Sequence, residues 1–189
     1  MHAHQYELLA IVSASPWFMQ ALRVVASLRL KRWCIGAGAV RNLVWDHLHG
    51  HAEPSSLSDV DVAYFDRDDL SPSTEKRLQS VLHTIAPVIP WEVTNQAAVH
   101  LWFEGYFGHK VAPLQSLEEA VASWPEYATS VGITLGEREE IQVIAPWGLD
   151  DLFGVTVRRN PTRVSLETYR QRIEQKRYSL RWPMVKVVT

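Results

Sequence analysis

The sequence predicts an α/β or α+β protein in which helices flank a small mixed sheet. Two observations predict this class. Segments with apolar residues at helical spacing are interleaved with short β-rich runs along the chain. The 189 residues, 47% hydrophobic and 21% charged, are typical of one well-cored globular domain. The chain shows no internal repeat and no low-complexity tract.

The first half of the chain predicts two N-terminal helices followed by strands and helices in alternation. Ser15-Pro16 and Ser71-Pro72 each place a capping serine before a proline at the first helical position. Gly50 is suited to end the helix that precedes it. We expect helices over residues 6–15, 15–30, 39–50 and 71–85, and strands over residues 32–37, 59–65 and 89–95.

The second half predicts more helices around a strand hairpin that turns at Gly136. We expect helices over residues 96–108, 117–124, 148–161 and 165–180, and strands over residues 129–136 and 139–146. The chain is accordingly divided into a core with N-terminal helices, residues 1–156, and a basic helical extension packed on that core, residues 157–189.

The charge of the chain is unevenly distributed. Residues 157–189 contain nine Lys or Arg and two Glu, a balance of +7, and the whole chain carries −2, which leaves −9 for residues 1–156. Two interpretations remain open. The extension is a solvated basic helix against an acidic body, or it borders a triphosphate or an RNA backbone.

The composition favours a cytoplasmic protein without a membrane segment. The single cysteine, Cys34, excludes an internal disulfide framework and suits a reducing compartment. The N-terminus lacks the basic segment and apolar run of a signal peptide, and no apolar run approaches the roughly 20 residues that span a bilayer.

The pair Asp59 and Asp61 is the first candidate for chemistry. Residues two apart on a strand point to the same face, so the two carboxylates project together. Carboxylates this close repel each other unless a cation lies between them. Mg²⁺ is often held by one or two carboxylates together with substrate phosphates. The alternative is that both acids lie on the solvated face of an edge strand.

The turn Gly36-Ala37-Gly38 is the second candidate. It ends an apolar strand and begins a helix. Small residues allow a ligand to approach the backbone, and the N–H groups at a helix N-terminus favour phosphate. A tight strand–helix corner without a ligand is the alternative for this turn taken alone.

Together these segments, residues 34–50 and 58–66, resemble the active-site core of the DNA polymerase β-like nucleotidyltransferase superfamily. The element Ala-Gly-Ala-Val-Arg-Asn is similar to the Gly-Gly-x-Val-Arg-Asp element of tRNA CCA-adding enzymes. Segments scattered from residue 34 to residue 161 also resemble an uncharacterised bacterial nucleotidyltransferase-like family. The resemblance implies a small mixed sheet flanked by helices, with the site at one edge.

The resemblance implies metal-dependent transfer of a nucleoside monophosphate from a nucleoside triphosphate to a hydroxyl acceptor, with release of pyrophosphate. Mg²⁺ or Mn²⁺ would bind Asp59 and Asp61. Gly36, Ala37 and Gly38 would hold the phosphates. The acceptor is left open among small molecules, proteins and RNA, and homo-oligomerisation is left open as well.

Two further residues have a functional and a structural interpretation. The superfamily often supplies a third carboxylate, for which Glu92 is the best match and Asp66 the competitor. Glu92 would complete the metal site or accept the hydroxyl proton, or it is a surface glutamate. Arg41, in the first turn after the glycines, could bind a phosphate or hold the helix in place.

The sequence departs from the superfamily pattern at two positions. Ala37 separates two glycines where the superfamily has Gly-Gly or Gly-Ser, and Asn42 replaces an aspartate of the CCA-adding enzymes. A nucleotidyltransferase-fold binding protein without catalysis is therefore the alternative, and an RNA-binding module that uses the basic extension is a second one. His47 and His51 have a helical metal-ligand spacing, but Gly50 interrupts the helix between them.

Overall fold

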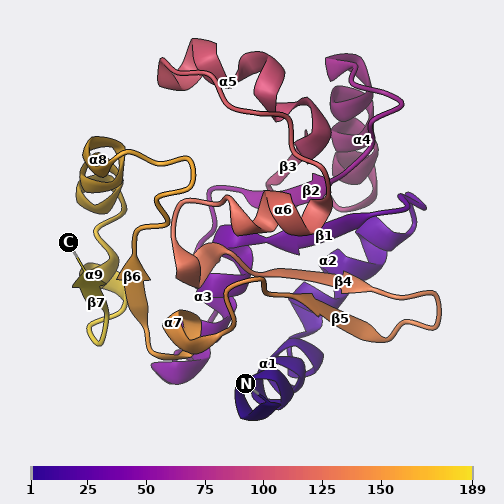
Figure 1. Cartoon of the computed structure of the whole chain (residues 1–189). Helices are drawn as coiled ribbons and strands as arrows, with labels where there is room; N and C mark the ends of the chain where they lie inside the picture. The colour runs from indigo at the N-terminus through magenta and orange to yellow at the C-terminus, as the bar shows by residue number, and fades with distance from the viewer. Residues whose placement is uncertain (1, 189) are drawn as a thin grey trace.

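A five-stranded mixed sheet forms the centre of the computed structural model, which describes residues 2–188 (Figure 1). The strand order is β3-β2-β1-β4-β5. Only β2 and β3 are parallel, and every other neighbouring pair is antiparallel. The strands are β1 (Trp33–Gly36), β2 (Val60–Tyr64), β3 (Trp91–Asn95), β4 (Gly132–Leu135) and β5 (Ile141–Ile144). All five fall within the predicted ranges.

Helices surround this sheet, as the helical periodicity predicted. They are α1 (His2–Ala14), α2 (Pro16–Ala26), α3 (Ala37–Leu48), α4 (Pro72–Ile85), α5 (Val99–Phe107), α6 (Leu117–Ala122), α7 (Asp150–Phe153), α8 (Leu166–Lys176) and α9 (Tyr178–Arg181). The predicted caps are found: Pro16 and Pro72 each stand in the first turn, and the Ser71 hydroxyl accepts a hydrogen bond from the Ser73 N–H.

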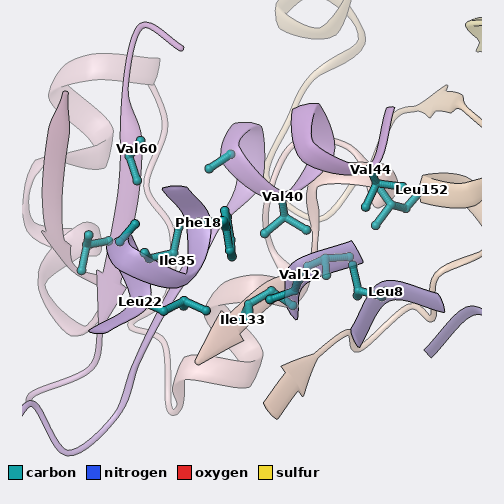
Figure 2. Packing of buried hydrophobic residues seen from close by; sticks show 14 of the residues in the cluster. Leu8, Val12, Phe18, Leu22, Ile35, Val40, Val44, Val60, Ile133 and Leu152 are labelled. Atoms are coloured by element: carbon teal, nitrogen blue, oxygen red, sulfur yellow. The ribbon is translucent and has the colours of Figure 1, made fainter. Parts of the chain in front are cut away.

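The two faces of the sheet bury different clusters. On one face, Ile35, Val60 and Val62 belong to the main core, which α1, α2, α3 and α4 complete (Figure 2). On the other face, Cys34 and Ala63 belong to a smaller cluster built around α6. Because strand side chains alternate between faces, Asp61 lies on the side of Cys34 and Ala63. The candidate acids therefore lie on the face with the smaller cluster.

No single helix in residues 2–188 is long and apolar enough to cross a bilayer. Only α1 and α2 taken together have the length and composition, and a bend of 88° separates them.

The prediction of a helix over residues 148–161 is wrong for most of that range. Helix α7 ends at Phe153, and β6 (Thr156–Arg158) follows and pairs in parallel with β7 (Lys186–Val188). The β-branched run Val155-Thr156-Val157 favours a strand. The extension is consequently not all helical, and a left-handed Arg177 (φ 44°) separates α8 from α9. The division into two units at residue 156 stays a prediction.

The extension is nevertheless fixed to the core. Tyr169, Tyr178 and Trp182 are buried in the main hydrophobic cluster. The Tyr169 hydroxyl lies 2.9 Å from the Val157 carbonyl oxygen and 2.8 Å from that of Val188, which links α8 to both short strands. Helix α8 is thereby held in one place beside the sheet.

Candidate active site

Strand pairing brings Asp61 beside the glycine turn. Strand β2 lies antiparallel to β1, with Ile35 opposite Val62. This register, continued by one residue, places Asp61 opposite Gly36, the last residue of β1. Gly36 in turn pairs with Gly132 of β4. The predicted proximity of the aspartates to the end of β1 therefore follows from the sheet itself.

The carboxylate of Asp61 is poorly neutralised by the protein. Burial, together with the nearby Asp59 and Glu92 carboxylates, raises its pKa to about 7, although Arg172 and Lys176 oppose the rise. No hydrogen bond or ion pair within residues 2–188 reaches this carboxylate. An acid in this setting has a higher affinity for a proton or for a metal cation than an ordinary surface aspartate.

Glu92 stands next to Asp61 on the parallel neighbour. The register pairs Asp61 with Glu92, so their side chains leave the sheet on the same face. Glu92 is exposed, and Asp59, just before β2, is half-buried. Asp59 accepts a hydrogen bond of 3.1 Å from the Ser58 hydroxyl. The strand that Glu92 needed is therefore present, and its role as third carboxylate stays a prediction.

The described residues contain no group of three or more His, Cys, Asp or Glu side chains close enough to hold a metal ion. Asp59 and Asp61 can thus offer a metal two protein carboxylates, and the remaining ligands of a hard cation would be water and phosphate oxygens.

The turn between β1 and α3 has a tightly constrained backbone. A Cβ on Gly36 would overlap the Trp124 ring, so only glycine fits there. Ala37 has a φ of 50°, in the left-handed region that favours glycine, and its N–H donates to the Val131 carbonyl at 3.3 Å. A glycine at position 37 would relieve this strain. The left-handed conformation of Ala37 consequently destabilises the fold by about 1–2 kcal/mol.

The N-terminus of α3 remains open to a ligand. No side chain caps this helix, because its N-cap residue is Gly36. A Cβ on Gly38 would meet only the Arg41 guanidinium, at 3.8 Å, so the backbone there is not covered by packing. Uncapped N–H groups at a helix start favour an anion.

Arg41 is buried between aromatic rings. Its guanidinium lies 5.5 Å from the Trp45 ring centre, 5.0 Å from that of Tyr178 and 5.4 Å from that of Trp182. It donates to the Asn42 Oδ1 atom through Nη2 at 2.7 Å, and burial lowers its pKa. These contacts attach α3 to α9, and a role of Arg41 in phosphate binding stays a prediction.

The basic extension reaches the site through α8. Arg172 forms an ion pair with the buried Glu126 and, like Lys176, is close enough to Asp61 to oppose the rise of its pKa. Reasoning from sequence did not single out either residue, although the charge balance of residues 157–189 was the signal that could have found them. Figure 1 shows α8 on one side of the β2–β3 edge and α4 on the other.

The competing candidates have structural contacts. Asp66 accepts a hydrogen bond of 2.9 Å from the Asp68 N–H and so stabilises the turn after β2. His51 lies 3.0 Å from the Asp46 carboxylate. His49, between the two histidines with helical spacing, is 2.7 Å from the Trp45 carbonyl oxygen. Asp66 therefore has a structural contact in the turn after β2.

The sequence pattern of a family described as "Nucleotidyltransferase" matches residues 23–187, which include the glycine turn, both aspartates and Glu92. The chain belongs to this nucleotidyltransferase family. The superfamily resemblance of the sequence is thereby confirmed, and the protein is a nucleotidyltransferase.

Solved structures agree with this assignment. An NMR structure described as revealing a CCA-adding enzyme head domain is 28% identical, with a TM-score of 0.83, and the similarity covers 97% of this chain and 95% of that one. A CCA-adding enzyme in an apo form is 14% identical (TM-score 0.57; 97% and 44% covered) and shares the fold. An apo tRNA-processing enzyme is 17% identical (TM-score 0.52; 90% and 42% covered). No curated protein gave a significant match.

Proposed function

We propose that this nucleotidyltransferase transfers a nucleoside monophosphate from a nucleoside triphosphate to an acceptor hydroxyl in a metal-dependent reaction. The acceptor oxygen forms a bond to the α-phosphorus, the bond from this phosphorus to the bridging oxygen breaks, and pyrophosphate leaves. The observation that carries the proposal is the position of Asp61, which has no hydrogen bond or ion pair within residues 2–188 and lies opposite Gly36, at the uncapped start of α3.

Asp59 and Asp61 would hold Mg²⁺ or Mn²⁺, which neutralises charge on the triphosphate and aligns it for displacement. Two neighbouring carboxylates, with no ion pair to Asp61 within residues 2–188, fit such an ion. The open N–H groups of Gly38 and its neighbours would bind the phosphates. Arg172 and Lys176 of α8 provide positive charge close enough to Asp61 to oppose the rise of its pKa. Glu92 would accept the proton of the acceptor hydroxyl.

The test is release of pyrophosphate from each of the four ribonucleoside triphosphates with Mg²⁺ and pools of hydroxyl-bearing acceptors. Asp59→Asn and Asp61→Asn should each lower turnover by roughly 10²-fold or more, because they remove a metal ligand and leave the shape unchanged. Asp68→Asn is the matched control, since Asp68 is an exposed acid of the turn after β2. Equal turnover of Asp61→Asn and Asp68→Asn would refute the proposal.

A second candidate is a member of the fold that binds a nucleotide without catalysis. Ala37 at a positive φ and the exposure of Glu92 favour it. The two candidates differ in one result. The binding protein would take up a metal–nucleotide complex in an Asp61-dependent way and release no pyrophosphate with any acceptor pool.

A further inference from the structure

A groove lies beside two of the candidate acids, Asp59 and Glu92, and Asp61 is not among its lining residues. It has a volume of about 630 Å³. It is lined by β3, by residues along α4 from Pro72 to His83 and by Trp102 of α5, and Asp59 and Glu92 are among the lining residues. A larger groove of about 1830 Å³, between the segment after α2 and the β4–β5 hairpin, is lined by neither aspartate. The smaller groove is therefore the space that a second substrate could occupy beside the acids.

The lining of this groove is acidic. Asp59, Glu75 and Glu92 contribute three carboxylates, whereas Lys76 is the one lysine or arginine among its described lining residues. Lys76 is exposed and forms no ion pair within residues 2–188. The Glu75 carboxylate accepts a hydrogen bond of 2.7 Å from the Asn95 N–H and so is fixed in place. The groove thus repels a polyanion and attracts a cation.

Charge is divided across the site. The basic residues Arg172 and Lys176 act on Asp61 from α8, and the acidic groove leaves the site on the α4 side. A triphosphate is best neutralised beside α8 and the start of α3. A bound metal–triphosphate complex keeps a net negative charge, so it does not make the groove attractive to an anion.

Trp102 supplies a flat aromatic surface in the groove. Trp102 is 45% exposed. Its aromatic neighbours among the described residues are Phe103 and Tyr106 of the same helix. A tryptophan ring is the strongest aromatic partner of an organic cation. The acidic lining and the indole therefore favour the same class of ligand.

We propose that this groove binds the acceptor, and that the acceptor is an organic cation with a hydroxyl group, whose charged end packs against Trp102 while its hydroxyl lies between Asp59 and Glu92. The inference rests on the proposed nucleotidyl transfer and gives it an acceptor class. An RNA 3′ end, the main competing acceptor, would bring its phosphates against three carboxylates.

The experiment follows the indole N–H resonance of Trp102 by NMR, assigned through its loss in Trp102→Phe. Choline and its neutral isostere 3,3-dimethylbutan-1-ol are titrated into the protein with Mg²⁺ and a non-hydrolysable nucleoside triphosphate. Choline should shift this resonance and bind at least about fivefold more tightly than the isostere. Trp102→Leu should remove that preference, and Leu101→Ala, which changes an exposed neighbour outside the groove, should keep it.

Lys76→Gln separates the cation from RNA. Loss of this positive charge should strengthen choline binding about twofold and weaken binding of a short single-stranded RNA. An RNA that shifts Trp102 more strongly than choline, or the absence of any choline shift, would overturn the inference. In the same samples, nucleotide-dependent shifts of the Gly38 and Asp61 amide resonances test nucleotide binding at the proposed active site. Nucleotide binding and choline binding are therefore measured separately, and one can fail without the other.

Discussion

Two carboxylates of this molecule, the buried Glu126 and the half-buried Asp61, have opposite surroundings. Glu126 is 1% exposed and fully engaged: Arg172 pairs with it at 2.5 Å, and the Tyr178 and Thr129 hydroxyls donate to it at 3.2 and 3.0 Å. Asp61 receives no such contact within residues 2–188, and burial, Asp59 and Glu92 raise its pKa to about 7. One acid is neutralised by contacts of the fold, and the other has no such contact among the described residues.

The difference shows which parts of the fold stabilise it. The contacts of Glu126 join α8 and α9 to the core. At the candidate site, by contrast, the strained backbone of Ala37 and the unneutralised carboxylate of Asp61 each lower the stability of the fold. Functional sites often carry local strain that the remaining structure compensates. Substitutions in the first region should therefore destabilise the protein, and substitutions at the site should stabilise it.

Glu126→Gln should have the largest effect on stability. It leaves the Arg172 guanidinium half-buried without a countercharge, which should lower the free energy of unfolding by about 3 kcal/mol. Urea unfolding of the variant and the wild-type protein at neutral pH measures this difference. A loss below about 1 kcal/mol would show that Glu126 is not the structural acid described here.

Asp46→Asn should follow, with a loss of about 2 kcal/mol. The Asp46 carboxylate accepts hydrogen bonds from the Trp182 indole N–H at 2.8 Å and from the Ser55 N–H at 2.7 Å, and it faces His51. The amide removes a charge and places a donor against these donors. Thermal unfolding checks the loss, and an unchanged midpoint would contradict the assignment.

Asp61→Asn should stabilise the metal-free protein by about 1–2 kcal/mol near pH 8, after allowance for partial exposure to water. The sign follows from the raised pKa. The folded wild type holds a proton that the unfolded chain, with a pKa of 3.8, releases, so its stability falls between about pH 4 and 7. Urea unfolding at several pH values should show no difference below about pH 4, a growing one up to pH 7 and a constant one above.

Ala37→Gly should give the smallest effect, a gain of about 1 kcal/mol. Glycine adopts a φ of 50° without the steric strain that alanine carries there, although it loses more chain entropy on folding. The matched substitution Ala39→Gly, in the same helix but buried and right-handed, should instead lower stability. Similar losses in both variants would contradict the strain described for the turn.

Local sequence patterns were sufficient to predict much of the site. The two-residue spacing placed Asp59 and Asp61 together, and the small residues after an apolar strand identified the turn. The Ser-Pro caps predicted where α2 and α4 begin. These features depend on neighbours along the chain, which is why a single sequence can reveal them.

Contacts between distant segments could not be predicted in this way. The register that sets Asp61 beside Glu92 depends on β2 and β3 meeting in the sheet. The aromatic surroundings of Arg41 come from α9, and the basic charges beside Asp61 come from α8. Strand β6 was mistaken for helix because its pairing with β7 decides the conformation of a short run.

Metal binding by Asp59 and Asp61 beside the glycine turn can be measured through paramagnetic broadening by Mn²⁺. With a non-hydrolysable nucleoside triphosphate present, substoichiometric Mn²⁺ should broaden the amide resonances of Asp59, Asp61 and Gly38 first, and Asp61→Asn should abolish that selectivity. If these resonances stay sharp while those around His49 and His51 broaden, the metal binds elsewhere and the account is contradicted.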